Sequence, residues 1–349
     1  MVFPLDAATV VPVARAAFWL AFVYYGSGSR IVLTLFAIPK AFRGQIDIIQ
    51  RNAIYSWTLL QPRPEIILLG SDPGTAEVAQ EFGLKHIPAI ECNEYGTPLM
   101  SSLFGLAQQV GIGPLFAYVN ADIILMQDFV AAIEQVPFRR FMLTGQRWNL
   151  DIAAALTFEP DWDSHLRQQV QRSGQQEGPQ AMDYFVFSRD TYTEIPPFAI
   201  GRLCWDNWML YKALNLKIPL IDASQAVTAV HQNHDYNHHP AGWDGVFLGP
   251  EAAQNLELLG GPHYTYFMLD LANWQMTPTG LRKPGWTWER LDRHLDMLPL
   301  ARPSLRPIAG RLLKLLRSRD QLPLAISKVK KIPARIVSRL RRSKPSSVK

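Results

Sequence analysis

From Ile31 onward, short apolar runs that end in polar or glycine-rich turns alternate with segments whose apolar residues recur at helical spacing. This pattern predicts strands in IVLTLFAIPK (31–40), EIILLGSDPG (65–74), HIPAIEC (86–92) and LFAYVNADIIL (115–125). It predicts helices in GQIDIIQRNAIYSW (44–57), GTAEVAQEFGL (74–84), TPLMSSLFGLAQQVG (97–111, capped by Thr97) and QDFVAAIEQV (127–136). The alternation is typical of an α/β protein with a mostly parallel central sheet covered by helices on both faces.

The pattern changes after Arg140. Strands are predicted in FMLTGQRW (141–148) and DYFVF (183–187), and the polar stretch between them, DSHLRQQVQRSGQQEGPQ (163–180), is expected to form a loop. We therefore expect four parts: an apolar helical segment at 1–28, two halves of one domain at 29–140 and 141–300, and a helical tail at 301–349.

Two polar side chains, Asn120 and Asp122, interrupt the otherwise apolar run LFAYVNADIIL. Burying a carboxylate in a strand is costly unless a partner offsets it, so a cation or a donor is expected opposite Asp122. Residues two apart on a strand share a face, so an amide oxygen and a carboxylate there can bind one divalent ion together. The alternative is that Asp122 caps the following helix.

Polar residues also follow the first two predicted strands, at Lys40 and Asp72. Ligands of parallel sheets bind beyond the carboxyl ends of the strands, where loops and helix N-termini converge. Three such strand ends together favour a binding site, although each residue alone is also explained as a turn residue or a cap.

Histidines cluster in AVTAVHQNHDYNHH (226–239), where His231 and His234 follow an apolar, strand-like run. A histidine at a strand end can supply a nitrogen ligand to a metal or a proton to a diphosphate. The histidine spacing, with no cysteine nearby, matches no common zinc motif. A lone histidine is more often structural, so the hypothesis depends on the cluster.

The stretch PPFAIGRLCWDNWMLYKAL (196–214) predicts a loop and then a helix that begins at Asp206 and Asn207, with Trp205 and Trp208 on one face. Tryptophan rings beside carboxylates commonly bind sugar rings. Asp206 is the candidate general base for an acceptor hydroxyl, and an N-cap is the alternative interpretation.

Eight segments, taken in order, resemble a group of glycosyltransferases with the GT-A fold: FAIPKAF, QRNAIYSW, EIILLGSDPGTAEVA, LFAYVNADIIL, GQRWNLDI, AMDYFVF, PPFAIGRLCWDNWML and AVHQNHDY. The resemblance covers Ile31 to Trp274, and the order of the segments makes it more specific than any single motif. It implies a Rossmann-like sheet whose N-terminal half binds a nucleotide-diphospho-sugar.

The resemblance also implies roles on the donor side. Asn120-Ala121-Asp122 is similar in position to the Asp-x-Asp motif that holds Mn or Mg on the donor diphosphate, with Asn120 in place of the first acid and Asp122 as the ligand. His231, with His234 as second choice, would complete the metal site. Asp72 would contact the nucleoside, and the remaining donor-side residues would be Lys40, Arg51, Asn52 and Arg147, the last also explained by a buried salt bridge.

On the acceptor side, the resemblance implies that Asp183 and Asp206 face the acceptor, and Trp205, Asn207 and Trp208 are the candidate substrate-binding residues. We therefore expect a metal-dependent glycosyltransferase that acts on a glycan or lipid-linked acceptor. The alternatives are a sugar nucleotidyltransferase, for which FAIPKAFRG is a poor match to the expected glycine-rich loop, and a decayed, non-catalytic binding module, which Asn120 favours.

Charge is distributed unevenly along the chain. Residues 302–349 hold 15 Lys and Arg against one acid, whereas the rest of the chain holds 20 basic and 29 acidic residues. Leucine and isoleucine recur at helical spacing in this tail, and it lacks aromatic residues for stacking on bases. An anionic membrane surface is therefore the expected partner of residues 302–344, rather than nucleic acid, with a solvated tail as the alternative.

Only two cysteines occur, Cys92 and Cys204, and their separation indicates neither a disulfide framework nor a zinc cluster. A cytoplasmic protein is expected, with peripheral attachment to the inner face of a membrane if the tail binds lipid. The apolar segment 7–25 is interrupted by Pro12 and Arg15 and is short for a membrane span, so a packed or interfacial helix is expected and a signal anchor is the alternative.

Overall fold

The computed structural model describes residues 32–234, 248–301 and 303–314. The expected helix at 1–28, the histidines at 238 and 239, and most of the basic tail lie outside the described residues. No helix in the described part of the chain is long and apolar enough to cross a membrane.

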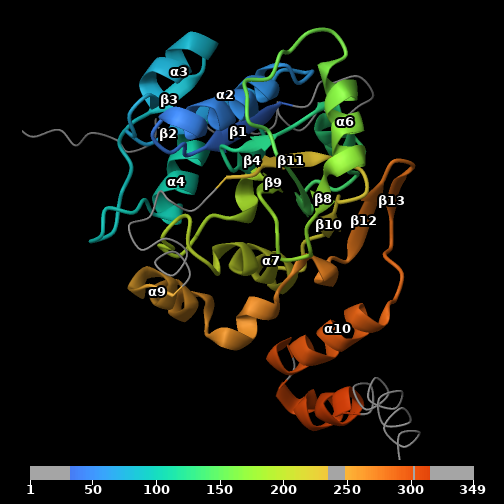
Figure 1. Ribbon diagram of the computed structural model, residues 1–349. Coiled ribbons are helices and arrows are strands. Elements are labelled where there is room, and N and C mark those ends of the chain that lie inside the picture. Colours follow the sequence, from blue (N-terminus) through green and yellow to red (C-terminus); the bar gives the residue numbers. More distant parts are fainter. Residues whose placement is uncertain (1–31, 235–247, 302, 315–349) are drawn as a thin grey trace, which may run out of the picture.

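A central sheet of nine strands runs through the described part of the chain and draws on both expected halves (Figure 1). The strands lie in the order β13-β12-β10-β6-β9-β4-β1-β2-β3, and all are parallel except β9 and β13. Their bounds are β1 Leu33–Ala37, β2 Glu65–Leu69, β3 Lys85–Ile87, β4 Leu115–Val119, β6 Met142–Thr144, β9 Tyr184–Ser188, β10 Leu220–Asp222, β12 Trp274–Thr277 and β13 Gly280–Arg282. The expected α/β class with a mostly parallel sheet is confirmed.

Helices cover both faces of this sheet, because successive strand residues point to opposite faces and both sets are apolar. Leu35 of β1 belongs to the core under α2 (Gly44–Thr58), α3 (Thr75–Phe82) and α5 (Gln127–Glu134). Phe36 belongs to the core under α4 (Met100–Val110), α7 (Trp205–Asn215), α9 (Pro250–Leu259) and α10 (Trp288–Ala301).

A smaller sheet lies beside the central one, with strand order β5-β11-β7-β8. Its strands are β5 Ile123–Ile124, β7 Arg147–Leu150, β8 Gln175–Gln176 and β11 Ala229–Gln232. Helix α6 (Trp162–Ser173) packs against it through Leu166 and Val170. The polar stretch expected to be a loop is therefore largely a helix, and the prediction was wrong because two apolar residues four apart suffice to anchor a helix on a sheet.

Three further local predictions were wrong. LFAYVNADIIL and FMLTGQRW each divide between the two sheets, since β4 ends at Val119 and β6 ends at Thr144. Thr97 does not cap α4, whose N-cap residue is Leu99. Helix α7 begins at Trp205 and not at Asp206, and its N-cap residue is Cys204. Each error concerns the ends of elements, which depend on tertiary pairing more than on local pattern.

Candidate functional site

A cavity of about 560 Å³ opens where the carboxyl ends of β1 and β4 meet the N-terminus of α7. Of the residues expected to form the site, it is lined by Lys40, Asp72, Asn120, Asp122, Arg147, Asp183, Trp205, Asp206, His231 and His234. These residues come from positions spread over most of the described chain. The strand order brings them together, as expected for a ligand site at this edge of a parallel sheet.

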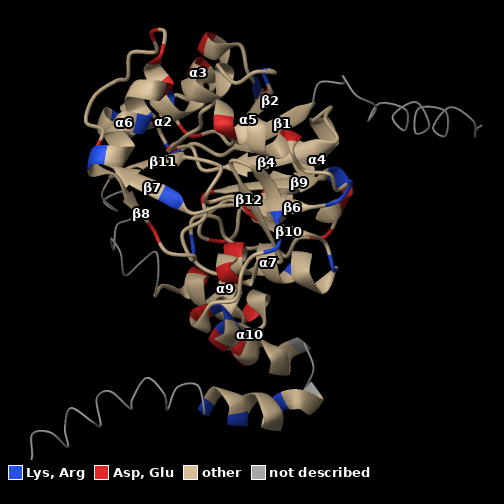
Figure 2. Ribbon diagram, turned by 90° about the vertical axis from the view of Figure 1, so that its right-hand side faces the viewer, with Lys and Arg blue, Asp and Glu red and all other residues tan. Residues whose placement is uncertain are grey.

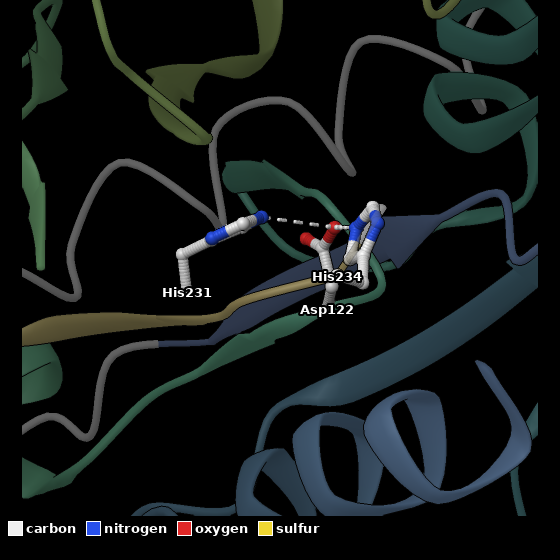
Figure 3. A group of neighbouring side chains, drawn as sticks. All are labelled: Asp122, His231 and His234. Carbon is white, nitrogen blue, oxygen red and sulfur yellow. Dashed lines mark hydrogen bonds and ion pairs between the residues drawn. The ribbon is translucent and has the colours of Figure 1, made fainter. Parts of the chain in front are cut away.

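Asp122 lies in the turn between β4 and β5, and the two histidines lie opposite it (Figure 3). Nε2 of His234 is 3.1 Å and Nε2 of His231 is 3.6 Å from Oδ2 of Asp122. The antiparallel pair β5 and β11 sets this arrangement, because His231 is directly paired with Ile123, the residue after Asp122. The partner expected opposite this buried carboxylate is therefore a pair of imidazoles.

The three side chains are close enough to bind one metal ion. Each of them offers one ligand atom, and the three atoms lie within 4.8 Å of one another. Oδ1 of Asp122 and Nδ1 of His231 are buried and have no hydrogen-bond partner among the described residues. A buried carboxylate oxygen without a donor is costly, so the unpartnered Oδ1 of Asp122 fits a bound cation. One carboxylate and two imidazoles suit Mn²⁺ better than Mg²⁺, which prefers oxygen ligands.

The protonation states of the cluster also suit a cation. Burial lowers the pKa of His231, and the opposing charge of Asp122 does not restore it, so the ring is neutral near pH 7. Burial alone would raise the pKa of Asp122, but the hydrogen bond with His234, and the charges that His231 and Lys40 carry at the acidic pH where a carboxyl titrates, bring it below its usual value. An ionised carboxylate beside a neutral imidazole is the state that binds a metal.

Asn120 does not share a face with Asp122, because β4 has already ended at Val119. Its amide instead donates a 2.7 Å hydrogen bond to Oδ1 of Asp183, and Nη1 of Arg147 lies 2.8 Å from Oδ2 of the same carboxylate. The expectation that Asn120 and Asp122 lie on a single strand was wrong, since neither residue is in a strand. That the two residues bind one cation stays a prediction. Asn120 belongs to a second polar cluster, with Asp183 and Arg147.

The wall formed by the start of α7 carries Trp205 and Asp206. Burial raises the pKa of Asp206 to about 6, and the nearby negative charge of Asp183 adds to the shift. One oxygen of Asp206 accepts a hydrogen bond from the backbone N–H of Asn207 at 2.9 Å. A carboxylate with this pKa, lining a cavity, can accept a proton near neutral pH.

Lys40 and Asp72 form the part of the cavity beyond β1 and β2. The Gln50 side chain forms two hydrogen bonds with the backbone of Lys40. It accepts one from the Lys40 N–H at 2.6 Å and donates one to the Lys40 carbonyl at 2.8 Å. Burial lowers the pKa of the Lys40 amine, and the Asp122 charge partly counters this. Burial raises the pKa of Asp72, partly countered by Arg43.

Four expected site residues do not line the described cavity. Arg51 pairs with Asp47 and Glu81 on the outer surface of α2. Asn52 is buried and bonds to Gln232. The remaining two serve packing: the Asn207 amide donates to the backbone carbonyls of Thr265 and Phe267, and the Trp208 ring packs between Tyr192 and Phe198.

Sequence reasoning missed other residues of the cavity wall, among them Tyr118, Glu177 and Arg202. Glu177 follows α6, in the stretch expected to be a loop, and its carboxylate accepts a 2.6 Å hydrogen bond from Asn149. Arg202 lies in the loop before α7, and the Gly201-Arg202 pair there indicated a charged turn. Tyr118 had no signal, because it looks like an ordinary apolar strand position.

No protein-family model matches the chain, and no curated protein matches it in sequence. Solved structures do match. One is glucosyl-3-phosphoglycerate synthase from Mycobacterium tuberculosis in complex with Mn²⁺, UDP and glucosyl-3-phosphoglycerate, at 13% identity and a TM-score of 0.38 over 66% of this chain and 81% of that chain. Another is the mannosyltransferase PcManGT from Pyrobaculum calidifontis in complex with GDP-Man and Mn²⁺, at 12% identity and a TM-score of 0.39 over 94% of this chain and 85% of that chain. At such identities and scores, these likenesses say nothing of the chemistry of this chain.

Proposed function

We propose that this chain is a divalent-metal-dependent glycosyltransferase that moves a sugar from a nucleoside diphosphate donor to a hydroxyl acceptor. The observation that carries this proposal is the cluster of Asp122, His231 and His234, which lies at the strand ends in a cavity with unused, buried ligand atoms. A cavity of about 560 Å³ is of the size that takes a nucleotide-sized ligand.

On the donor side, Asp122, His231 and His234 would hold the metal, whose chemistry is to neutralise charge on a leaving diphosphate. Lys40 and Arg147 line the same cavity and can bind phosphate oxygens as cations. Asp72, beyond β2, lines the same cavity and would accept hydrogen bonds from a nucleoside.

On the acceptor side, Trp205 lines the cavity but is 7% exposed and packs against Tyr118 and Phe185, so a sugar would meet only part of its ring. Asp206 would supply a base. With a pKa of about 6, Asp206 is mostly ionised at pH 7 and can take the proton of an acceptor hydroxyl as that oxygen attacks the sugar. Asp183 is paired with Arg147 and is better suited to hold a hydroxyl group than to accept its proton.

Calorimetric titration with UDP and GDP, each with and without Mn²⁺, tests the proposal. We expect nucleotide binding that needs Mn²⁺ and is lost in Asp122→Ala. Asp47→Ala is the matched control, because Asp47 pairs with Arg51 on α2 and does not line the described cavity. Binding unaffected by both Mn²⁺ and Asp122→Ala would overturn the proposed donor site.

Turnover separates an enzyme from a binding module. UDP-glucose and GDP-mannose, with Mn²⁺ present, should release the nucleoside diphosphate, and Asp206→Asn should bind the donor but release little product. A chain that binds these donors tightly and turns over neither of them would favour the non-catalytic alternative. Release of pyrophosphate from a nucleoside triphosphate and a sugar phosphate would favour the nucleotidyltransferase.

A lipid-linked acceptor at an anionic membrane surface is the finer part of the proposal. In Figure 2 the ribbon of the helical stretch that follows α10 is blue at its Lys and Arg positions. Ile308 is 53% and Leu312 is 43% exposed there, beside Arg311 and Lys314 in the sequence. Exposed apolar side chains beside cations are the combination that binds anionic lipid surfaces.

A further inference from the structure

The turn that carries Asp122 is fastened to helix α2 by buried polar groups. The indole N–H of Trp57 donates to the carbonyl of Ile123 at 2.8 Å, and the Ser56 hydroxyl accepts from the N–H of Leu125 at 3.2 Å. Both bonds hold the chain after Asp122. The carbonyl of Asp122 itself is held from the other side, by strand β11.

Gln232 supplies that contact. It is the last residue of β11, is fully buried, and lies between His231 and His234 in the sequence. Its side-chain amide donates to the carbonyl of Asp122 at 3.1 Å and to the carbonyl of Ile49, in α2, at 2.8 Å. One side chain therefore joins the carboxylate turn, the histidine strand and the helix behind them.

The orientation of the Gln232 amide is fixed by Asn52. The Asn52 amide donates to Oε1 of Gln232 at 3.0 Å and to the carbonyl of Ala154 at 3.2 Å, and its oxygen accepts from the N–H of Leu156 at 2.8 Å. With its oxygen engaged in this way, Gln232 can present only its two N–H groups to the carbonyls of Asp122 and Ile49.

Strand pairing alone leaves this arrangement weakly determined. Strands β5 and β11 share only two residue pairs, Ile124 with Val230 and Ile123 with His231. Metal ligands must be held to within about 0.5 Å of their working positions, which usually takes hydrogen bonds from residues behind them. A nonpolar side chain of similar size would leave the Asn52 donor and the Asp122 carbonyl without the bonds that the Gln232 amide makes.

We propose that Gln232 is a positioning residue of the metal centre, which fixes the separation of the Asp122 carboxylate from the two imidazoles by tying the Asp122 carbonyl to α2. This inference rests on the proposed function only in that a cation binds Asp122, His231 and His234. Asn52 acts one step further back, by orienting the glutamine.

Gln232→Met tests the inference, because methionine keeps the length of the side chain and removes its hydrogen bonds. Thr34→Val is the control: Thr34 is fully buried, and its hydroxyl donates to Glu65 at 2.7 Å at the other end of β1. The measurements are the affinity for Mn²⁺ by calorimetry, the visible absorption spectrum of bound Co²⁺, and the urea midpoint of each metal-free protein.

We expect both variants to lose stability, but only Gln232→Met to bind Mn²⁺ about ten- to hundredfold more weakly and to change the Co²⁺ spectrum. If Gln232→Met does not fold, Gln232→Asn takes its place, since it keeps an amide that is too short to reach both carbonyls. Unchanged Mn²⁺ affinity and Co²⁺ spectrum in the folded variant would overturn the inference and leave the metal centre standing. Wild-type protein that binds neither ion would overturn the centre itself, and this inference with it.

Discussion

The side-chain amide of Asn120 donates a 2.7 Å hydrogen bond to one oxygen of Asp183, whose other oxygen pairs with Arg147 at 2.8 Å. Asparagine at position 120 suits Asp183, because a neutral amide can donate a hydrogen bond to a carboxylate that already pairs with the Arg147 guanidinium. A second aspartate here would lie within hydrogen-bonding distance of Asp183 with no proton to share at neutral pH.

The variant Asn120→Asp should lose stability and should not gain affinity for Mn²⁺. Replacing the donor with a carboxylate at this distance costs about 1–3 kcal/mol of unfolding free energy at pH 8. One carboxyl of the new pair has its pKa raised in the folded state, so the penalty grows as pH rises through that pKa and shrinks towards pH 5. Urea titrations at both pH values measure this difference.

Asn233→Asp is the matched control. Asn233 makes the same kind of bond, at 2.7 Å to Asp151, but on the exposed surface, where solvent screens the new repulsion. A penalty for Asn120→Asp that is no larger than this control, or tighter Mn²⁺ binding, would show that Asn120 stands in for a missing metal ligand.

Metal removal should lower the melting temperature of the wild-type protein. At a Mn²⁺ concentration of about 100 times its dissociation constant, binding stabilises the fold by about 2.7 kcal/mol, which corresponds to roughly 3–5 °C for a chain of this size. Differential scanning calorimetry with Mn²⁺ and then with excess EDTA measures this shift. It should vanish in Asp122→Ala and persist in Asp47→Ala, and a shift that persists in both would place the ion elsewhere.

Much of the fold could be predicted from the sequence, because strands buried on two faces leave uninterrupted apolar runs. The first two strands and the helices α2, α3 and α4 were found within a few residues, whereas the strand predicted at 86–92 shares only two residues with β3. The exceptions have a common cause: β5, β7 and β8 are short, and they exist because β11 or a neighbouring strand pairs with them, which no local pattern reveals. Helix α6 was missed because the sheet that it covers was missed.

The sequence also predicted part of the site. The sequence pointed to Asp122 and His231 separately, through polar residues at apolar strand ends, and the structure brings them together across β5 and β11. It did not indicate that Asn120 would turn away towards Asp183. Nor did it indicate that Asn52, on the buried side of an amphipathic helix, serves Gln232 and not the cavity.

The transfer rate should fall on the acid side of its pH profile with an apparent pKa near 6. Burial and the Asp183 charge raise the pKa of Asp206 to about 6, so acidification protonates it and removes the proposed base, while alkaline pH leaves it ionised. Asp206→Asn should lower kcat by 10²-fold or more, within the usual range for a lost general base, and flatten this limb. An acid limb unchanged in Asp206→Asn would assign the titration to another group.

Breaking the pair between Arg202 and Glu251 should destabilise the cavity wall. Their side chains are 11% and 8% exposed and meet at 2.6 Å, and Glu251 also accepts from Asn93 at 2.7 Å. Glu251→Leu leaves a nearly buried guanidinium without its carboxylate, which costs about 3–5 kcal/mol of unfolding free energy. Glu81→Leu removes one of the two partners of Arg51 at a more exposed site, leaves Asp47 in place, and should cost below about 1 kcal/mol. If urea titration gives the same loss of unfolding free energy for Glu251→Leu and Glu81→Leu, burial does not decide how much each ion pair contributes.

Binding to anionic vesicles should depend on the two apolar side chains as well as on the charges after α10. In co-sedimentation with vesicles of mixed phosphatidylcholine and phosphatidylglycerol, replacing Arg311 and Lys314 with Glu reverses two charges near the lipid surface. Since each cation contributes on the order of 1 kcal/mol, bound protein should fall at least tenfold.

Replacing Ile308 and Leu312 with Ser should weaken binding at high salt as well, because burial of apolar side chains is not screened by ions. The control for net charge replaces Arg282, on β13, and Lys283, just beyond it, with Glu. If the control variant loses as much vesicle-bound protein, the binding comes from net charge alone and not from a specific membrane contact after α10.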